Sequence, residues 1–257
     1  MKKSVNTEKN NLFLISLLVL VVGCEVIIRI LEIPGYILPA PTKVIKALYS
    51  QKEVLFSHSL VTLFEALTGF ILSIILALII GGVVYPFEKV KKMLYPYLLI
   101  SQTIPLIAIA PVILIWFGFG ILPKIIIVVL ICTFPMLLSF LGGLEEVDRE
   151  ILDLFQVMGA DKKYIFFKVI LPSSLPSFFS GVKIAATYSI MGAVIGEWLG
   201  AKSGLGIYMT RAISSFKTDY LFAAIIVVVI LSLVIFKGIE YIEKAAMPWK
   251  QGKNRNL

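Results

Sequence analysis

The sequence predicts an all-α membrane protein that crosses the bilayer six times and forms a single domain over residues 1–257. Hydrophobic residues make up 59% of the chain and charged residues only 16%, whereas soluble domains are about 45–50% apolar and about 25% charged. The apolar runs extend over about 20 residues without alternation, which is the length of a membrane-spanning helix. Because backbone groups in lipid need internal partners, these runs are expected to be helical.

Six apolar runs define the expected spans, and proline or glycine residues mark most of the joins between them. The spans cover about residues 12–31, 60–84, 95–117, 121–141, 177–199 and 220–239. The third and fourth spans are joined by the tight turn Gly118-Phe119-Gly120, so they form a helical hairpin. Pro105, Pro111 and Pro135 lie inside these two spans and are expected to bend them.

Lysine and arginine residues set the expected orientation. If both termini are cytoplasmic, the inner segments hold twice as many of these residues as the outer loops, as the positive-inside rule requires. The inner set is Lys2, Lys3, Lys9, Lys89, Lys91, Lys92, Arg149, Lys162, Lys163, Lys168, Lys244, Lys250, Lys253 and Arg255, and the outer set is Lys43, Lys46, Lys52, Lys124, Lys202, Arg211 and Lys217. The polar loop 144–176 is therefore placed in the cytoplasm. The net charge of +8 is interpreted as a signal for topology and lipid headgroups rather than for nucleic acid.

The N-terminus is open to a second interpretation. Residues 21–24 resemble a lipoprotein cleavage box, and processing there would make Cys24 the first residue of the mature chain. The apolar run continues to Leu31, long enough to be a span itself, and its removal would leave the other five spans in the same orientation. Cys24 and Cys132 both lie in apolar runs, so packing is expected of them rather than a disulfide.

No motif in the sequence supports a catalytic centre, a metal site or an ATP site. Residues 196–203 hold two glycines followed by Lys202 and Ser203, but their spacing is not that of a phosphate-binding loop. His58 is the single histidine, so the sequence gives little support for a histidine-based catalytic triad or metal cluster. We therefore expect a chain that is not an enzyme and binds no cofactor of its own.

Small residues recur at steps of three or four along the second and fifth spans, so each set lies on one helix face. Such faces let helix backbones approach closely in lipid, which favours packing within the chain; lining a path or sliding during a conformational change is the alternative. The sets are Thr62, Ala66, Gly69, Ser73, Ala77 and Gly81, and Gly181, Ala185, Ser189, Gly192 and Gly196.

The loop 144–176 reads as a helix, a turn and a second helix. Apolar residues from Leu144 to Met158 recur at helical spacing among acidic ones, which predicts an amphipathic helix too charged to span the membrane. Gly159 supplies a helix stop, and the carboxylate of Asp161 is placed to cap a second helix over about 162–171, which Pro172 ends. This element either lies on the lipid headgroups or docks in a groove of a partner.

At this loop the chain resembles the permease subunit of bacterial ABC importers. The family signature is a Glu-Ala-Ala triplet, then a glycine four residues after its last alanine, and then a final segment similar to Ile-x-Leu-Pro. Gly159 and residues 170–172 match this signature. The triplet is Asp153-Leu154-Phe155 instead, in which the first residue is still acidic but the two small residues are replaced by bulky ones. The departure affects the detailed contacts of this helix rather than the identity of the loop.

The resemblance covers about residues 36–250. Residues 38–44 are similar to the segment before the second span in nitrate/sulfonate/taurine-type permeases, and residues 109–120 are similar to the third span and turn of that group. Gly204-Leu205-Gly206, before the last span, is similar as well. Residues 192–201 and 108–116 look most like the branch associated with thiamine-precursor aminopyrimidines.

The resemblance implies a type I importer fold in the inner membrane of a bacterial cell. Two permease subunits, expected to be identical copies, would assemble with two cytoplasmic ATPase subunits that use ATP and magnesium, and an external binding protein would deliver the solute. The loop would contain the coupling helix, which binds the ATPase subunit. Its expected docking residues are Asp153, Gln156, Gly159, Ala160, Asp161, Lys162, Leu171 and Pro172.

Three polar residues within or near span ends are candidates for the substrate path, because burial of such groups in a membrane is costly and often functional. They are Gln102, Tyr188 and Glu197. The expected substrate is a thiamine-precursor pyrimidine or a similar heterocycle; nitrate, alkanesulfonates, taurine and riboflavin are alternatives. A different class, an ion-coupled secondary transporter, is disfavoured because intramembrane charge is sparse and ion coupling usually needs buried carboxylates.

Overall fold

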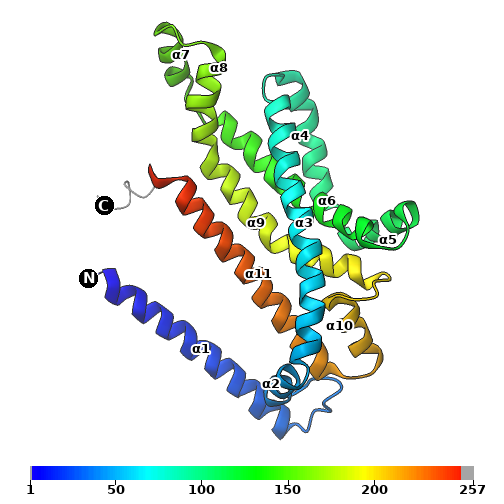
Figure 1. The fold of residues 1–257 in the computed structure, drawn as a ribbon. Helices are drawn as coiled ribbons and strands as arrows, with labels where there is room; N and C mark the ends of the chain where they lie inside the picture. Colours follow the sequence, from blue (N-terminus) through cyan, green and yellow to red (C-terminus); the bar gives the residue numbers. More distant parts are fainter. Residues whose placement is uncertain (1, 250–257) are drawn as a thin grey trace. The chain divides into compact units, whose positions relative to one another are not determined.

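The computed structural model describes the backbone of residues 2–249, and the side chains from residue 12 to 249 except those of residues 13, 14 and 17. Every regular element in this part of the chain is helical (Figure 1). The chain divides into two compact units. The first unit comprises Met1–His58 with Tyr208–Val227, and the second comprises Ser59–Ile207 with Val228–Leu257.

The first unit is built on α1 (Lys2–Ile30) and α2 (Pro41–Ser50), with parts of α3 (Lys52–Val84), α10 (Leu205–Ser214) and α11 (Thr218–Ala246). Pro41 occupies the first turn of α2, where its missing N–H costs nothing. The carboxylate of Glu25 in α1 accepts hydrogen bonds from the Thr42 backbone N–H at 3.0 Å and the Thr42 hydroxyl at 2.9 Å. An acidic side chain thus satisfies the free donors at the start of α2.

The second unit is organised around α6 (Ile121–Glu145), which packs along α9 (Leu171–Trp198) and against α3. Both stripes of small residues face α6. A Cβ added at Gly69 on α3 would lie 2.6 Å from Val128, and one at Gly181 on α9 would lie 2.6 Å from Ser139. The two faces therefore serve close helix packing within the chain, as their spacing predicts.

Two neighbouring glycines on α3 test this packing. A side chain at Gly81 would collide with the ring of Phe140 on α6, whereas one at Gly82 meets nothing within 4 Å. We expect Gly81→Leu to destabilise the fold by about 1–3 kcal/mol through overpacking, and Gly82→Leu to be neutral or slightly stabilising because glycine is a poor helix former. Thermal unfolding of the two purified variants in one detergent checks this. Equal losses from both would contradict the packing of α3 on α6.

The third expected span is not one helix. It forms α4 (Glu88–Thr103) and α5 (Leu106–Phe117), which meet at an angle of 99°. Pro105 has no N–H to continue the ladder, and Ile104 before it takes an extended conformation with ψ of 122°, as residues before proline prefer. The expected bend of the span over 95–117 is therefore present at Pro105, where it breaks the helix in two, whereas Pro111 and Pro135 lie inside α5 and α6.

Pro172 does not end the second helix of the polar loop. Residues Lys162–Ile165 form α8, Phe166–Ile170 form a single π-helical turn, and α9 follows directly, so the backbone is helical from Lys162 to Trp198. A wider π turn before the proline accommodates its ring and its missing donor without a break. The predicted helix end at 171 and the predicted span start at 177 were wrong for this reason.

Among the described residues, four helices are long and apolar enough to cross a membrane, and a fifth span results if α4 and α5 are taken together. The four are α3, the helix from Lys162 to Trp198, α6 and α11. Part of the orientation argument lies outside the described side chains, namely that from Lys2, Lys3, Lys9, Lys250, Lys253 and Arg255. The helix α1 covers the remaining expected span, 12–31.

Candidate functional site

The polar loop forms a helical knob, defined here as α7 (Arg149–Val157), the turn at residues 158–161 and α8. Gly159 has φ of +84° and ends α7 with two hydrogen bonds. Its N–H donates to Gln156 at 2.9 Å, and the N–H of Ala160 donates to Phe155 at 3.0 Å, which is the Schellman arrangement. The predicted helix stop is confirmed.

Asp161 begins the second helix of the knob as predicted. Its carboxylate accepts a hydrogen bond of 2.8 Å from the backbone N–H of Tyr164, and so caps a donor that has no partner within the helix. A carboxylate at a helix start also interacts favourably with the positive end of the helix dipole. The turn is thus held from both sides by local interactions.

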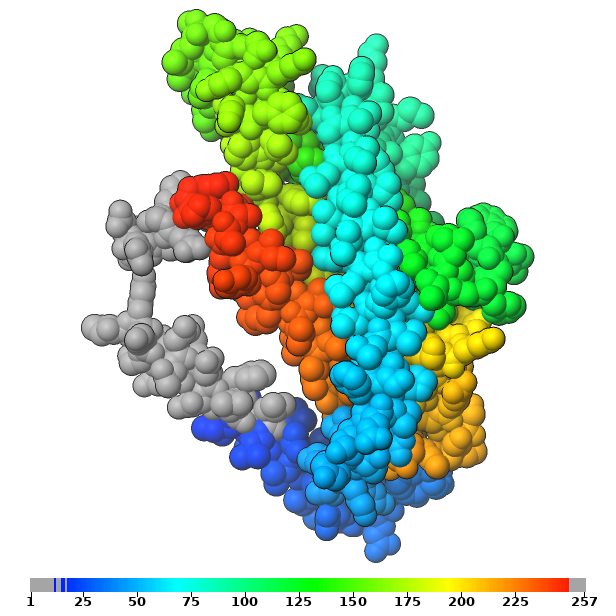
Figure 2. Space-filling model, in the orientation of Figure 1, coloured from blue at the N-terminus to red at the C-terminus, as the bar shows by residue number. Residues whose placement is uncertain are grey.

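The surface of the knob is largely exposed. No residue of α7 is buried, and the apolar side chains of Val157 and Met158 are 87% and 72% exposed. In Figure 2 the knob forms part of the yellow-green lobe at the upper left. These exposed apolar side chains make the knob a candidate interaction surface.

The expected docking residues fall into two groups. Those near the turn are exposed or, for Ala160, half-buried: Asp153, Gln156, Gly159, Ala160, Asp161 and Lys162. Leu171 and Pro172 are half-buried and lie inside the long helix, nine or more residues beyond Lys162. At about 1.5 Å per residue they sit roughly 14 Å along that helix, so the structure does not bring them to the turn.

An ion pair joins the end of α6 to the start of α4. Lys91 on α4 makes an ion pair of 2.6 Å with Glu145 at the end of α6, and its Nζ lies 5.8 Å from the centre of the Tyr85 ring. Burial raises the pKa of the Tyr85 hydroxyl above its usual value, so this ring stays neutral beside the lysine. A cavity of about 870 Å³ opens here. The end of α6, from which the chain continues into the knob, is thereby linked to α4.

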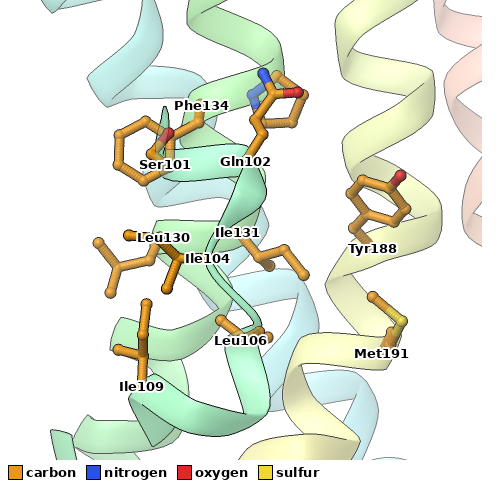
Figure 3. A pocket seen from close by; sticks show the side chains of 11 residues that line it. Ser101, Gln102, Ile104, Leu106, Ile109, Leu130, Ile131, Phe134, Tyr188 and Met191 are labelled. Carbon is orange, nitrogen blue, oxygen red and sulfur yellow. The ribbon is translucent and has the colours of Figure 1, made fainter. Parts of the chain in front are cut away.

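The break between α4 and α5 opens a second cavity, of about 440 Å³. Gln102, in the last turn of α4, and Tyr188, on α9, both line it, although 86 residues separate them in the sequence (Figure 3). Neither side chain has a hydrogen-bond partner among the described residues. The remaining lining is mostly apolar: Ser101, Ile104, Leu106, Ile109, Leu130, Ile131, Phe134, Pro135 and Met191.

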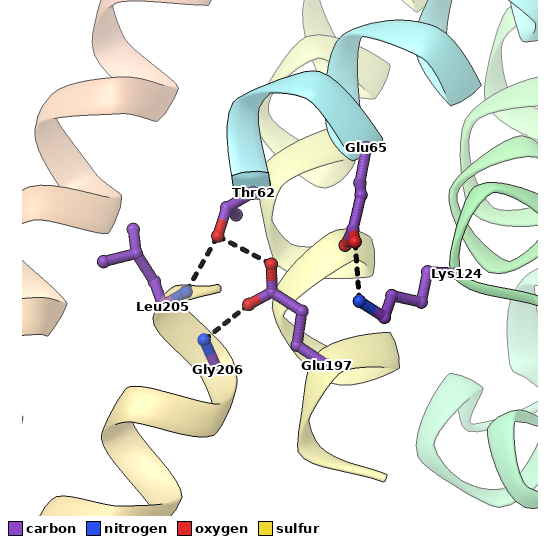
Figure 4. A network of polar contacts seen from close by, with 6 residues as sticks. All are labelled: Thr62, Glu65, Lys124, Glu197, Leu205 and Gly206. Atoms are coloured by element: carbon purple, nitrogen blue, oxygen red, sulfur yellow. Dashed lines mark hydrogen bonds and ion pairs between the residues drawn. The ribbon is translucent and has the colours of Figure 1, made fainter. Parts of the chain in front are cut away.

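The third candidate, Glu197, is separated from the cavity and belongs to a buried polar cluster at the other end of α9 from the knob (Figure 4). Its carboxylate accepts hydrogen bonds from the Thr62 hydroxyl at 2.6 Å and from the Gly206 N–H at 2.5 Å. Thr62 in turn accepts the Leu205 N–H at 2.9 Å. Glu197 therefore holds the first turn of α10, whose free N–H groups attract an anion.

The same cluster contains an ion pair that the sequence analysis missed. Lys124 on α6 lies 2.6 Å from Glu65 on α3, and the two side chains are 8% and 0% exposed. Lys124 is therefore not a residue of an outer loop, as expected from the sequence, but part of a buried network. Glu65 is the one charged residue of the apolar run 60–84, and an acid in that setting needs a nearby partner. That signal was available in the sequence, although it did not name the partner.

These features define a class of protein: a polytopic helical membrane protein with a membrane cavity at a broken helix and a helical knob at one end. The chain belongs to the family described as binding-protein-dependent transport system inner membrane component, whose model matches residues 69–247. Members of this family lack ATPase activity and a cofactor of their own, so the chain is a transport subunit rather than an enzyme. The importer permease expected from the sequence is thereby confirmed.

Individual relatives agree with this assignment. The chain is 35% identical over 252 residues to the formylaminopyrimidine transport permease protein ThiX of Halalkalibacterium halodurans, covering 98% of this chain and 99% of the relative. It is 37% identical over 209 residues to a probable ABC transporter permease protein of Haemophilus influenzae, covering 81% and 85%. An inward-facing structure of the MetNI methionine ABC transporter matches with a TM-score of 0.65 at 18% identity, over 77% of this chain and 98% of that one, which supports the fold.

Proposed function

We propose that this chain is the permease through which an ATP-driven importer moves an aminopyrimidine, or a similar uncharged heterocycle, into the cytoplasm. The main support for an uncharged substrate is the cavity at the α4–α5 break, because no lysine, arginine or histidine is among its lining residues. Nitrate, sulfonates and taurine would all bring an anionic group into this cavity without a cation to receive it, and burial of an unpaired charge is costly. The full-length similarity to a permease named for formylaminopyrimidine points the same way.

The knob is proposed to be the coupling element. Its exposed apolar side chains, Val157 and Met158, and the turn at Gly159 would lie in a groove of a cytoplasmic ATPase subunit. Closure of the ATPases on ATP would move the knob, and the continuous helix from Lys162 to Trp198 would transmit that movement to Tyr188 at the cavity. A rigid element that joins two bistable parts is what such coupling requires. Magnesium and ATP belong to the ATPase in this arrangement.

The assembly is proposed to contain two copies of this chain, two ATPase subunits and an external binding protein, in the inner membrane with both termini cytoplasmic. Tyr188 and Met191 at the cavity are 40% and 43% exposed, and a second permease copy would cover them. The helix α1 is proposed as the sixth span, with Cys24 inside it rather than at a processed end. Intact mass of the purified complex measures both the copy number and the start of the chain.

Uptake by proteoliposomes tests the proposal. We expect vesicles holding the permease–ATPase complex to accumulate labelled formylaminopyrimidine when the binding protein is outside and ATP is enclosed, with no uptake when ATP is absent. The buried carboxyl groups of Glu65 and Glu197 show that intramembrane charge is less sparse than the sequence suggested, so an ion gradient without ATP is the matched condition. Uptake driven by the gradient alone would instead identify a secondary transporter.

A further inference from the structure

We infer that the cavity at the α4–α5 break is a ligand-binding site within the permease itself, and that Gln102 determines its preference for a heterocycle bearing an amino group. This inference rests on the proposed function for its substrate class and adds a selecting residue to it. The cavity volume of about 440 Å³ lies within the usual range of about 300–1,000 Å³ for small-molecule sites.

The backbone around the cavity is built as membrane binding sites are. At the break, the carbonyl groups of the last turn of α4 receive no backbone N–H from a further turn, and the Thr103 hydroxyl donates to one of them, that of Ile100. Irregular backbone inside a membrane occurs where it lines a cavity or is covered by protein, and broken helices form the substrate sites of many transporters. Pro105 therefore does more than bend a span, because the cavity lies at the break that it makes between α4 and α5, next to Gln102.

The polar side chains of the cavity gather at one end. Figure 3 shows Ser101 and Gln102 together beside Phe134, with Tyr188 across the gap and Ile109 at the far end. The Ser101 hydroxyl donates to the Leu98 carbonyl at 2.7 Å, so it can offer a ligand only its lone pairs. Gln102 and Tyr188 keep both a donor and an acceptor for a ligand.

The carboxamide of Gln102 matches the edge of an aminopyrimidine. Such a ring presents an acceptor nitrogen beside an exocyclic amino donor, and a carboxamide pairs with that pattern through two parallel hydrogen bonds, as asparagine and glutamine do with adenine. The Phe134 and Tyr188 rings supply aromatic surface for the body of the heterocycle. A ligand lacking the amino group would leave the Gln102 carbonyl unpaired in a largely apolar cavity, which is costly.

The test is equilibrium binding to the purified permease–ATPase complex, without the binding protein, of two probes: formylaminopyrimidine and its analogue with methyl in place of the amino group. We expect the wild type to prefer the amino compound by about tenfold, the order of one bidentate pair. Gln102→Leu should bind both compounds alike. Thr103→Val is the matched control, because Thr103 is the next residue, does not line the cavity, and its hydroxyl bonds the Ile100 carbonyl.

Tyr188→Phe is a second variant in case Gln102→Leu does not assemble. It should weaken binding of the amino compound, while Thr187→Val, which removes a hydroxyl outside the cavity lining, should not. Unchanged preference in Gln102→Leu, or equal effects of both hydroxyl removals, overturns the inference. Wild-type vesicles that fail to import the amino compound count against the proposed function instead, so the two failures are distinguishable.

Discussion

Replacing Lys124 with methionine is expected to destabilise the second unit by about 3–5 kcal/mol, the cost of leaving a buried charge without its partner. Glu65 and Glu197 are both fully buried, and Lys124 is the cation that faces Glu65 at 2.6 Å. Its removal leaves two carboxyl groups in the cluster with no positive side chain to balance them. The free energy of unfolding, measured by detergent titration of the purified permease, checks the effect.

Two controls distinguish the loss of the buried ion pair from the effect of removing any lysine. Lys237→Met removes a lysine that is 71% exposed and paired with Glu240 at 2.7 Å, and exposed pairs contribute at most about 1 kcal/mol. The double change Glu65→Leu with Lys124→Met removes both partners and is expected to regain most of the loss. Equal destabilisation by Lys124→Met and Lys237→Met would show that the cluster does not stabilise the fold.

The second large effect is expected at the turn of the knob. Gly159→Val should reduce ATP-driven uptake and ATPase copurification by about 5–30-fold, because a left-handed conformation costs an L-residue about 1–2 kcal/mol and φ here is +84°. A side chain at Gly159 meets nothing within 4 Å, so the substitution strains the turn without disturbing helix packing. Membrane insertion and cavity binding should be unchanged.

Gly159→Asn is the matched control, since asparagine enters the left-handed region more readily than other residues, and it should retain most of the uptake. Asp161→Ala removes the cap of α8 and should lower uptake less, in line with about 1 kcal/mol for a helix cap. Normal ATPase copurification with Gly159→Val would mean that the partner does not dock at this turn.

Local features of the chain were predictable because each depends on a few consecutive residues. The Gly159 stop and the Asp161 cap follow from the conformational freedom of glycine and the reach of a short carboxylate. The stripes that contain Gly69 and Gly181 follow from helical periodicity, and both pack on α6 as small faces do. The resemblance at the loop then identified the importer class, which the family match confirms.

The effect of a proline inside an apolar helical run was hard to predict from the sequence, because such a proline can either break the helix or be accommodated within it. Pro105 and Pro172 are both prolines in apolar helical sequence, yet α4 and α5 bend by 99° at the first, while the helix continues through the second after a π turn. The missing N–H is the same in both cases. What differs is the backbone before each proline, since Ile104 is extended whereas Leu171 is helical.

The sequence alone determined that this protein is a helical membrane protein with a polar helix–turn–helix loop, because hydrophobic length and turn residues act over short distances, and its resemblance to importer permeases gave its class. Only the tertiary structure joined Gln102 to Tyr188 in one cavity, and Glu65 to Lys124 in one buried ion pair. These partners lie 86 and 59 residues apart, and no rule of spacing relates them. Their contact depends on how α3, α4, α6 and α9 pack, which is a property of the whole second unit.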